Sequence, residues 1–141
     1  MTSISPTQLL EQRNQYLATG DTEGFIGLFA PDAVIELPFA GPGMPDRIEG
    51  SAAIGEYARH VNDSGVKLDA VENVEVYEST DPEVVVVETR ATGTLPTGQP
   101  LSRTSIQIFR VRDGKILLFR DFFDPRGLDI MDLAAGDGSA N

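Results

Sequence analysis

The sequence predicts an α+β domain in which three N-terminal helices cover the concave face of a strongly curved, antiparallel or mixed β-sheet. Two observations support this prediction. Residues 5–63 contain helix-capping signals and apolar residues at helical spacing, whereas residues 66–123 alternate between apolar and polar with a period of two. Helices followed by a meander of strands are typical of α+β proteins, in which the helices pack on one sheet face. The 141 residues are expected to form one domain, residues 1–141.

Three helices are expected in the first half of the chain. Ser5 and Gln8 form a capping box that starts the first helix, and Gly20 ends it. Asp21 caps a short second helix, and Ser51 caps a third. Each of these residues supplies the side-chain acceptor or the left-handed backbone that a helix end requires.

Five strands are expected, separated by turns rich in Gly, Pro and Asp. A strand at residues 33–39 precedes a Gly- and Pro-rich loop at 40–49 that no helix could cross. The four long strands fall at residues 66–78, 83–95, 101–111 and 115–123. A weak helix is expected at 127–135, and residues 136–141 read as a disordered tail.

Composition and charge exclude several classes of function. The chain has 22 acidic and 11 basic residues, a net charge of −11, and such a surface repels nucleic acid. It has no cysteine and one histidine, and it contains no nucleotide-binding motif, so no metal and no cofactor are expected. No apolar run is long enough to cross a membrane, and no signal-peptide pattern is visible. A cytoplasmic location is therefore expected.

Asp121 is the most unusual residue, because it lies between Phe119 and Phe123 on one face of a strand. The hairpin that follows Asp113 has two possible registers. A three-residue loop would place Asp121 opposite Ser105, whereas a two-residue turn would send it to the other face. We favour the three-residue loop, because it groups polar side chains together.

A turn centred on residues 97–98 would align the preceding hairpin so that its polar side chains share the face of Asp121. This face would line a cavity under the helices, with an apolar wall and a few convergent polar groups. Its expected members are Glu88, Arg90, Thr92, Arg103, Ser105, Gln107, Asp121, Phe119 and Phe123, joined by Glu36 from the first strand and Tyr57 from the third helix. The opposite, convex face would carry Val85, Val87, Ile106, Ile108, Leu118 and Phe122, an apolar patch typical of a homodimer interface.

Residues 8–133 resemble the nuclear-transport-factor-2-like (NTF2-like) superfamily. The stretches YLATGDTEGFIGLFAPDAVIELPF, RIEGSAAIGEYA and DGKILLFRDFFDP carry the resemblance. Within it, the chain is similar to SnoaL-like polyketide cyclases, ketosteroid isomerases, limonene-epoxide hydrolase and the phenazine-biosynthesis A/B proteins. The resemblance implies a cone-shaped α+β fold with a deep pocket, usually in a dimer. Because this fold hosts many reactions, it implies no single chemistry.

The resemblance also implies roles for several positions. The acid of limonene-epoxide hydrolase falls on Asp121, and its Arg-x-Asp pair falls on residues 88–90, with the charges in reversed order. The base of the ketosteroid isomerases falls on Leu37, and their oxyanion-binding tyrosine and aspartate fall on Arg13 and Gln107. Several of these groups keep a carboxyl group at Asp121.

These observations favour a cofactor-free enzyme that cyclises or isomerises a hydrophobic, oxygenated, polyketide-like metabolite by acid–base catalysis. Asp121 would move the proton, and Arg90 and Arg103 would hold developing negative charge. Glu88 or Glu36 would be the second carboxylate. Two alternatives stay open: an epoxide hydrolase or epoxide-opening cyclase, and a non-catalytic binding or dimerisation module. Asp121 itself is either catalytic or the ion-pair partner of an arginine.

Overall fold

The computed structural model describes residues 4–124, which form an α+β fold with a six-stranded sheet. The elements, in chain order, are α1 (Pro6–Thr19), α2 (Thr22–Ile26), β1 (Phe29–Glu36), β2 (Arg47–Glu49), α3 (Ser51–Asp63), β3 (Lys67–Glu78), β4 (Val84–Thr94), β5 (Pro100–Arg112) and β6 (Lys115–Phe122). The expected helix at 127–135 and the tail at 136–141 lie outside the described residues.

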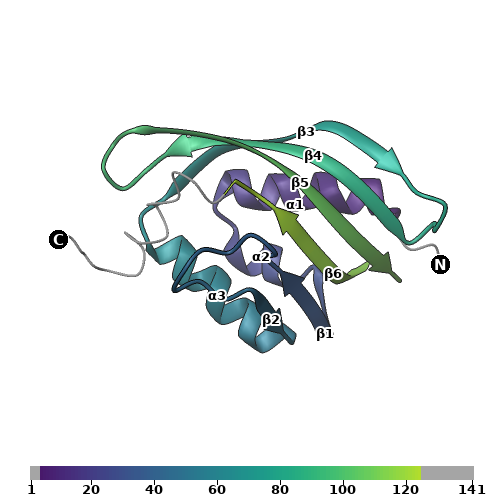
Figure 1. Cartoon of the computed structure of the whole chain (residues 1–141). Helices are drawn as coiled ribbons and strands as arrows, with labels where there is room; N and C mark the ends of the chain where they lie inside the picture. Colours follow the sequence, from purple (N-terminus) through teal and green to yellow (C-terminus); the bar gives the residue numbers. More distant parts are fainter. Residues whose placement is uncertain (1–3, 125–141) are drawn as a thin grey trace.

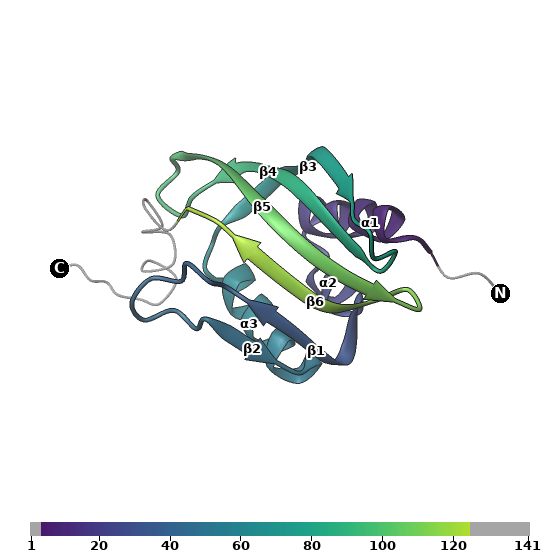
Figure 2. The same cartoon turned by 45° about the vertical axis from the view of Figure 1, so that its right-hand side comes forward.

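The sheet is mixed, and it curves around the helices as predicted. Its strand order is β2-β1-β6-β5-β4-β3, with β1 and β6 parallel and every other pair antiparallel. In Figure 1 the long strands β3, β4 and β5 arch over α1, and Figure 2 shows all three helices on the same side of the sheet. The fold class expected from the sequence is therefore confirmed.

The helix ends follow local chemistry, with one exception. The capping box of Ser5 and Gln8 is present, Gly20 ends α1 with φ 74°, and Asp21 caps α2 by accepting from the Gly24 N–H. The expectation for Ser51 was wrong: Ser51 is the first residue of α3, and the N-cap is Gly50 with φ 90° and no side-chain cap. A glycine tolerates this left-handed backbone without strain.

The first strand begins earlier than predicted, and a second strand was missed. β1 starts at Phe29 rather than residue 33, and its register with β6 shifts between Phe29 and Val34, the interval that contains Pro31. β2 lies within the segment predicted to be a loop and pairs with β1. Three residues between prolines and glycines are too short a run to show strand alternation.

The β4–β5 hairpin differs from its predicted register by one residue. Thr92 pairs with Ser102 instead of Arg103, because the loop has three residues, with Gly98 at φ 90°. A one-residue change moves side chains to the opposite face. The polar residues Glu88, Arg90 and Thr92 consequently lie on the convex face, and Val85 and Val87 are buried on the concave face.

The β5–β6 hairpin was also predicted in the wrong form, although Asp121 lies on the expected face. Asp113 and Gly114 form a two-residue turn with φ 53° and 74°, and Arg112 pairs with Lys115. The register then shifts, because Arg110 pairs with Leu118 and Leu117 is left without a partner on β5. This β-bulge adds one residue to β6, so the side chains after it face the opposite side from the one that a regular two-residue hairpin would give them. Asp121 therefore pairs with Gln107 and faces inward.

Candidate active site

The helices do not fill the concave face of the sheet. A cavity of about 390 Å³ lies between them, a size typical of small-molecule sites. Its wall is mainly apolar, and α1, α3 and the sheet all contribute to it. Representative apolar lining residues are Leu17, Phe25, Leu37, Met44, Ile54 and Phe119.

Asp121 is buried at this cavity, with only 7% of its surface exposed. Its Oδ1 atom has no hydrogen-bond partner among the described residues. Burial raises the pKa of Asp121, and the positive charge of Arg103 is the largest influence in the opposite direction. Among the described residues no arginine or lysine forms an ion pair with Asp121. The carboxyl group therefore belongs to the cavity lining and has no ion-pair partner among the described residues.

Arg13 is a second buried charge at the cavity, 1% exposed. It follows Leu9 and Leu10 by about one helical turn, so α1 directs it toward the sheet. Its Nε donates to Asn14 Oδ1 (2.7 Å) and its Nη1 donates to Gln107 Oε1 (2.9 Å). Its Nη2 has no partner among the described residues. Burial lowers the pKa of Arg13 to about 10, which leaves it charged at neutral pH.

Gln107 connects Arg13 with Asp121. Its Oε1 also accepts from Thr89 Oγ1 (3.1 Å), and its Nε2 donates to Ser105 Oγ (3.3 Å). Because two donors hold the Oε1 atom, the amide group must turn its NH2 toward Ser105 and Asp121. The side chains of Gln107 and Ser105 both act to lower the pKa of Asp121 against the effect of burial.

Arg103 and Tyr57 are two further polar residues of the cavity lining. The Arg103 guanidinium lies over the Phe123 ring, 5.5 Å from its centroid, a geometry that favours a cation. Tyr57 comes from α3, and burial raises the pKa of its hydroxyl, whereas Arg103 lowers it. Tyr57 is therefore a neutral hydrogen-bonding group at neutral pH.

The structure brings together most of the residues predicted to form the site. Those that line the cavity are Asp121, Arg103, Ser105, Gln107, Tyr57, Phe119 and Phe123. The predicted members outside it are Glu88, Arg90, Thr92 and Glu36. The first three lie on the convex face because of the β4–β5 register.

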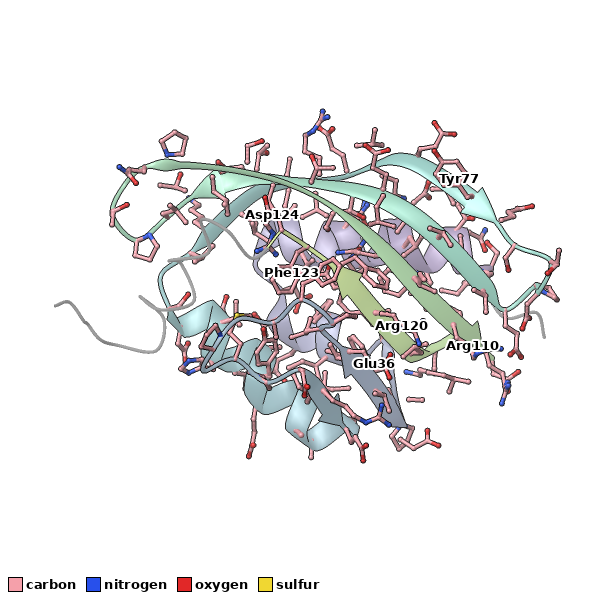
Figure 3. The ribbon with its side chains drawn as sticks, viewed as in Figure 1. Glu36, Tyr77, Arg110, Arg120, Phe123 and Asp124 are labelled. Atoms are coloured by element: carbon pink, nitrogen blue, oxygen red, sulfur yellow. The ribbon has the colours of Figure 1, made fainter. Side chains whose placement is uncertain are left out.

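Glu36 lies outside the cavity because it alternates with Ile35 and Leu37, which line it. Glu36 instead accepts hydrogen bonds from Arg47 and Arg120, each at 2.7 Å. Figure 3 shows Glu36 and Arg120 next to each other on β1 and β6. These ion pairs join β1 to both of its neighbours, β2 and β6, and give Glu36 a structural role.

Two of the buried polar residues at the cavity were not predicted from the strand pattern. Thr89 was missed because the incorrect hairpin register placed it on the other face. Arg13 interrupts the apolar stripe of Leu9, Leu10, Tyr16 and Leu17, and a charge at such a position was the available signal. Within the described residues, no group of three His, Asp or Glu side chains is arranged to hold a metal ion. No helix among residues 4–124 is long and apolar enough to cross a membrane.

Comparison with known proteins identifies relatives over most of the chain. An uncharacterized PhzA/B-like protein of Pseudomonas aeruginosa is 34% identical over 127 residues, which cover 86% of each chain. A crystal structure of a candidate isomerase from Bacillus subtilis has a TM-score of 0.81 and 30% identity, covering 92% of this chain and 91% of the other.

More distant solved structures share the fold alone. One is RV0760c from Mycobacterium tuberculosis in complex with estradiol-17beta-hemisuccinate, with a TM-score of 0.73, 22% identity and coverage of 86% and 95%. A candidate polyketide cyclase from Pseudomonas putida, the epoxide hydrolase/cyclase-like enzyme SalBIII and a Mycobacterium ketosteroid isomerase have TM-scores of 0.68–0.71 and identities of 18–23%.

The sequence profile of the SnoaL-like domain matches residues 10–119, which include most of α1, all of α2 and α3, and nearly all of the sheet. Together with the identity to the Pseudomonas relative, this match establishes the family. The chain belongs to the SnoaL-like domain family.

Proposed function

We propose that the protein is a cofactor-independent enzyme that cyclises or isomerises a hydrophobic, oxygenated small molecule by general acid–base catalysis. The observation that carries this proposal is Asp121, a buried carboxyl group with an unpartnered oxygen in an apolar cavity. A carboxyl group whose pKa is raised by burial exchanges protons near neutral pH more readily than an exposed one.

The structure changes the roles assigned from the sequence. Glu88 and Glu36 lie outside the cavity, so Asp121 is the one carboxyl group in the lining that the described residues form. Acid and base steps would then fall on the same residue. Asp121 would remove a proton from a carbon of the substrate and return it to another atom. Arg103 would stabilise the negative charge that develops on the substrate oxygen, in place of Arg90.

The relatives support the reaction class without defining the substrate. Cyclase, isomerase and epoxide hydrolase/cyclase-like proteins share this fold, and one structural neighbour binds a steroid ester. The mainly apolar lining of this cavity, with few polar groups, suits a hydrophobic ligand.

The base function can be tested without the natural substrate. The probe 5-nitrobenzisoxazole opens to a coloured phenolate when a base removes the proton on C3 of its isoxazole ring and the N–O bond breaks. The protein should accelerate this reaction, and Asp121→Asn should reduce the acceleration by about 10²- to 10⁴-fold. The rate should rise with pH through a pKa above the ordinary Asp value of about 3.9.

Glu88→Gln is the matched control, because it removes the same charge from the convex face of the sheet. It should leave the rate unchanged. No acceleration by the wild-type protein would favour a binding module instead of an enzyme. Equal losses in the two variants would place the reaction outside the cavity.

Epoxide opening is the second candidate function, favoured by the raised pKa of Asp121. A protonated carboxyl group can donate to the epoxide oxygen, as the opening step requires. Conversion of cyclohexene oxide to its diol, lost in Asp121→Asn, would support this alternative.

We also propose a homodimer formed through the convex face. Ile106 on this face is 42% exposed, and it lies near Phe39, which is 53% exposed and packs edge-to-face against Phe122 at 5.8 Å. Ile108 and Leu118 are half-buried on the same face. Burying these side chains in a partner would stabilise the dimer by the hydrophobic effect.

A further inference from the structure

The cavity carries an excess of positive charge, although the protein as a whole is strongly negative. Acidic residues outnumber basic ones 22 to 11 in the chain. The charged residues that line the cavity are instead Arg13, Lys67, Arg103 and Asp121, which are three cations and one carboxyl group. Arg13 and Asp121 are buried, Arg103 is half-buried and Lys67 is exposed. Buried charges are screened less than exposed ones, so Arg13, Asp121 and Arg103 have the largest influence on which sign of charge a bound molecule prefers.

Arg13 is the charge that most requires a partner. Its guanidinium is buried, donates hydrogen bonds to the neutral side chains of Asn14 and Gln107, and lies over the Phe109 ring, 5.1 Å from its centroid. None of these partners carries a negative charge. Its Nη2 is unpartnered among the described residues, although it lies in a residue that lines the cavity. Buried charged groups are normally paired, because an unpaired one loses its hydration without compensation.

Asp121 does not compensate both arginines. It interacts with Arg103 and with Arg13 at the same time, and it forms an ion pair with neither within the described part of the chain. Even when Asp121 is ionised, one of the two guanidinium charges stays uncompensated. When Asp121 takes a proton from the substrate, it becomes neutral and one oxyanion develops. That oxyanion would compensate one arginine, and the second would still lack an anion.

We propose that the substrate of this site is an organic anion, a carboxylate attached to an apolar body. The carboxylate would pair with the charge of the Arg13 guanidinium, and the apolar body would pack against residues such as Phe25, Leu37 and Ile54. Arg13 thereby holds the permanent charge of the substrate, and Arg103 is left for the charge that develops. This inference rests on the proposed function, since it names the substrate class of the same site.

The inference is tested by the binding of probes that differ only in charge. The probes are naphthalene-2-carboxylate and naphthalene-2-carboxamide, measured by calorimetry at neutral pH, where the first is an anion and the second is neutral. The carboxylate should bind about 10- to 100-fold more tightly, the effect of a hydrogen bond between charged groups. Arg13→Gln should abolish this preference, and Arg13→Lys, which keeps the charge, should retain part of it.

Arg90→Gln is the matched control, because it removes one positive charge from an exposed residue on the convex face. It should leave the preference for the carboxylate unchanged. Circular dichroism verifies that each variant is folded. If Arg13→Gln does not fold, the comparison of the two probes on the wild-type protein still decides the question.

Three results would overturn the inference: equal affinities, tighter binding of the amide, or no binding of either probe at millimolar concentration. A loss of the preference in Arg90→Gln as large as in Arg13→Gln would also overturn it. The binding test is independent of the proposed catalysis, because the two naphthalene probes only bind and do not react. Failure of the proposed function would be seen instead with 5-nitrobenzisoxazole. If Asp121→Asn retained the activity on 5-nitrobenzisoxazole while the carboxylate preference persisted, the catalytic proposal would fail and the anion site would stand.

Discussion

Replacing Asp121 by asparagine should separate a catalytic carboxyl group from a structural one. Removing one member of a buried ion pair costs about 3–5 kcal/mol of stability, because the other charge is left uncompensated. In a chain of this size, each kcal/mol shifts the melting temperature by roughly 2–4 °C. A structural Asp121 would therefore lower the melting temperature by roughly 6–20 °C.

The structure leads to a different expectation. Asp121 has no ion pair among the described residues, its Oδ1 has no partner, and burial raises its pKa. The neutral, isosteric asparagine resembles the protonated carboxyl group that burial favours. We expect a change in unfolding free energy of less than about 1 kcal/mol, in the stabilising direction at neutral pH. Thermal melts followed by circular dichroism measure it.

The pH dependence gives this prediction a second test. Below the pKa of the unfolded chain, about 3.9, Asp121 is protonated in both states and contributes no difference. As the pH rises toward the higher pKa of the folded state, the unfolded chain ionises first and the wild-type protein loses stability relative to the variant. The stability of Asp121→Asn relative to wild type should therefore increase from about pH 4 upward. A melting temperature lower by more than about 6 °C, or a relative stability that decreases over this range, would refute the reasoning.

Two further predictions concern the strands. Gly93→Ala would place a methyl group directly against the Lys67 carbonyl across the β3–β4 ladder, so denaturant unfolding should show a loss of roughly 1–3 kcal/mol. Gly41→Ala is its control, since nothing lies near that position, and it should change stability by less than about 0.5 kcal/mol. Ile106→Asp should convert the proposed dimer into a monomer in sedimentation velocity runs at micromolar concentration. A monomeric wild-type protein would contradict the interface.

Local chemistry made some elements predictable from the sequence. The capping box of Ser5 and Gln8 and the cap of Asp21 depend on residues within three or four positions, and all three are as expected. The period-two pattern identified the four long strands, because alternation is visible in a single chain. The curved α+β sheet followed from the order of these elements.

The composition of the cavity was less predictable, because it depends on loop lengths. Pairing in the β4–β5 hairpin depends on whether the turn has two or three residues, and the flanking sequence allows both. This one choice decided whether Arg90 or Thr89 belonged to the site. The hydrogen bond between Arg13 and Gln107 could not be predicted from the sequence, because it depends on how α1 packs on the sheet and the two residues lie 94 positions apart.

The unpaired Leu117 has a consequence for how this strand could change during evolution. It is one residue more than regular pairing with β5 requires. Deleting it would remove the bulge and leave Leu118 opposite Arg110 and Asp121 opposite Gln107, as they are now. The loss of one residue between the turn and Asp121 could therefore be accommodated by the bulge without moving Asp121 to the convex face. A strand without this extra residue would instead expel Asp121 from the cavity at the first deletion.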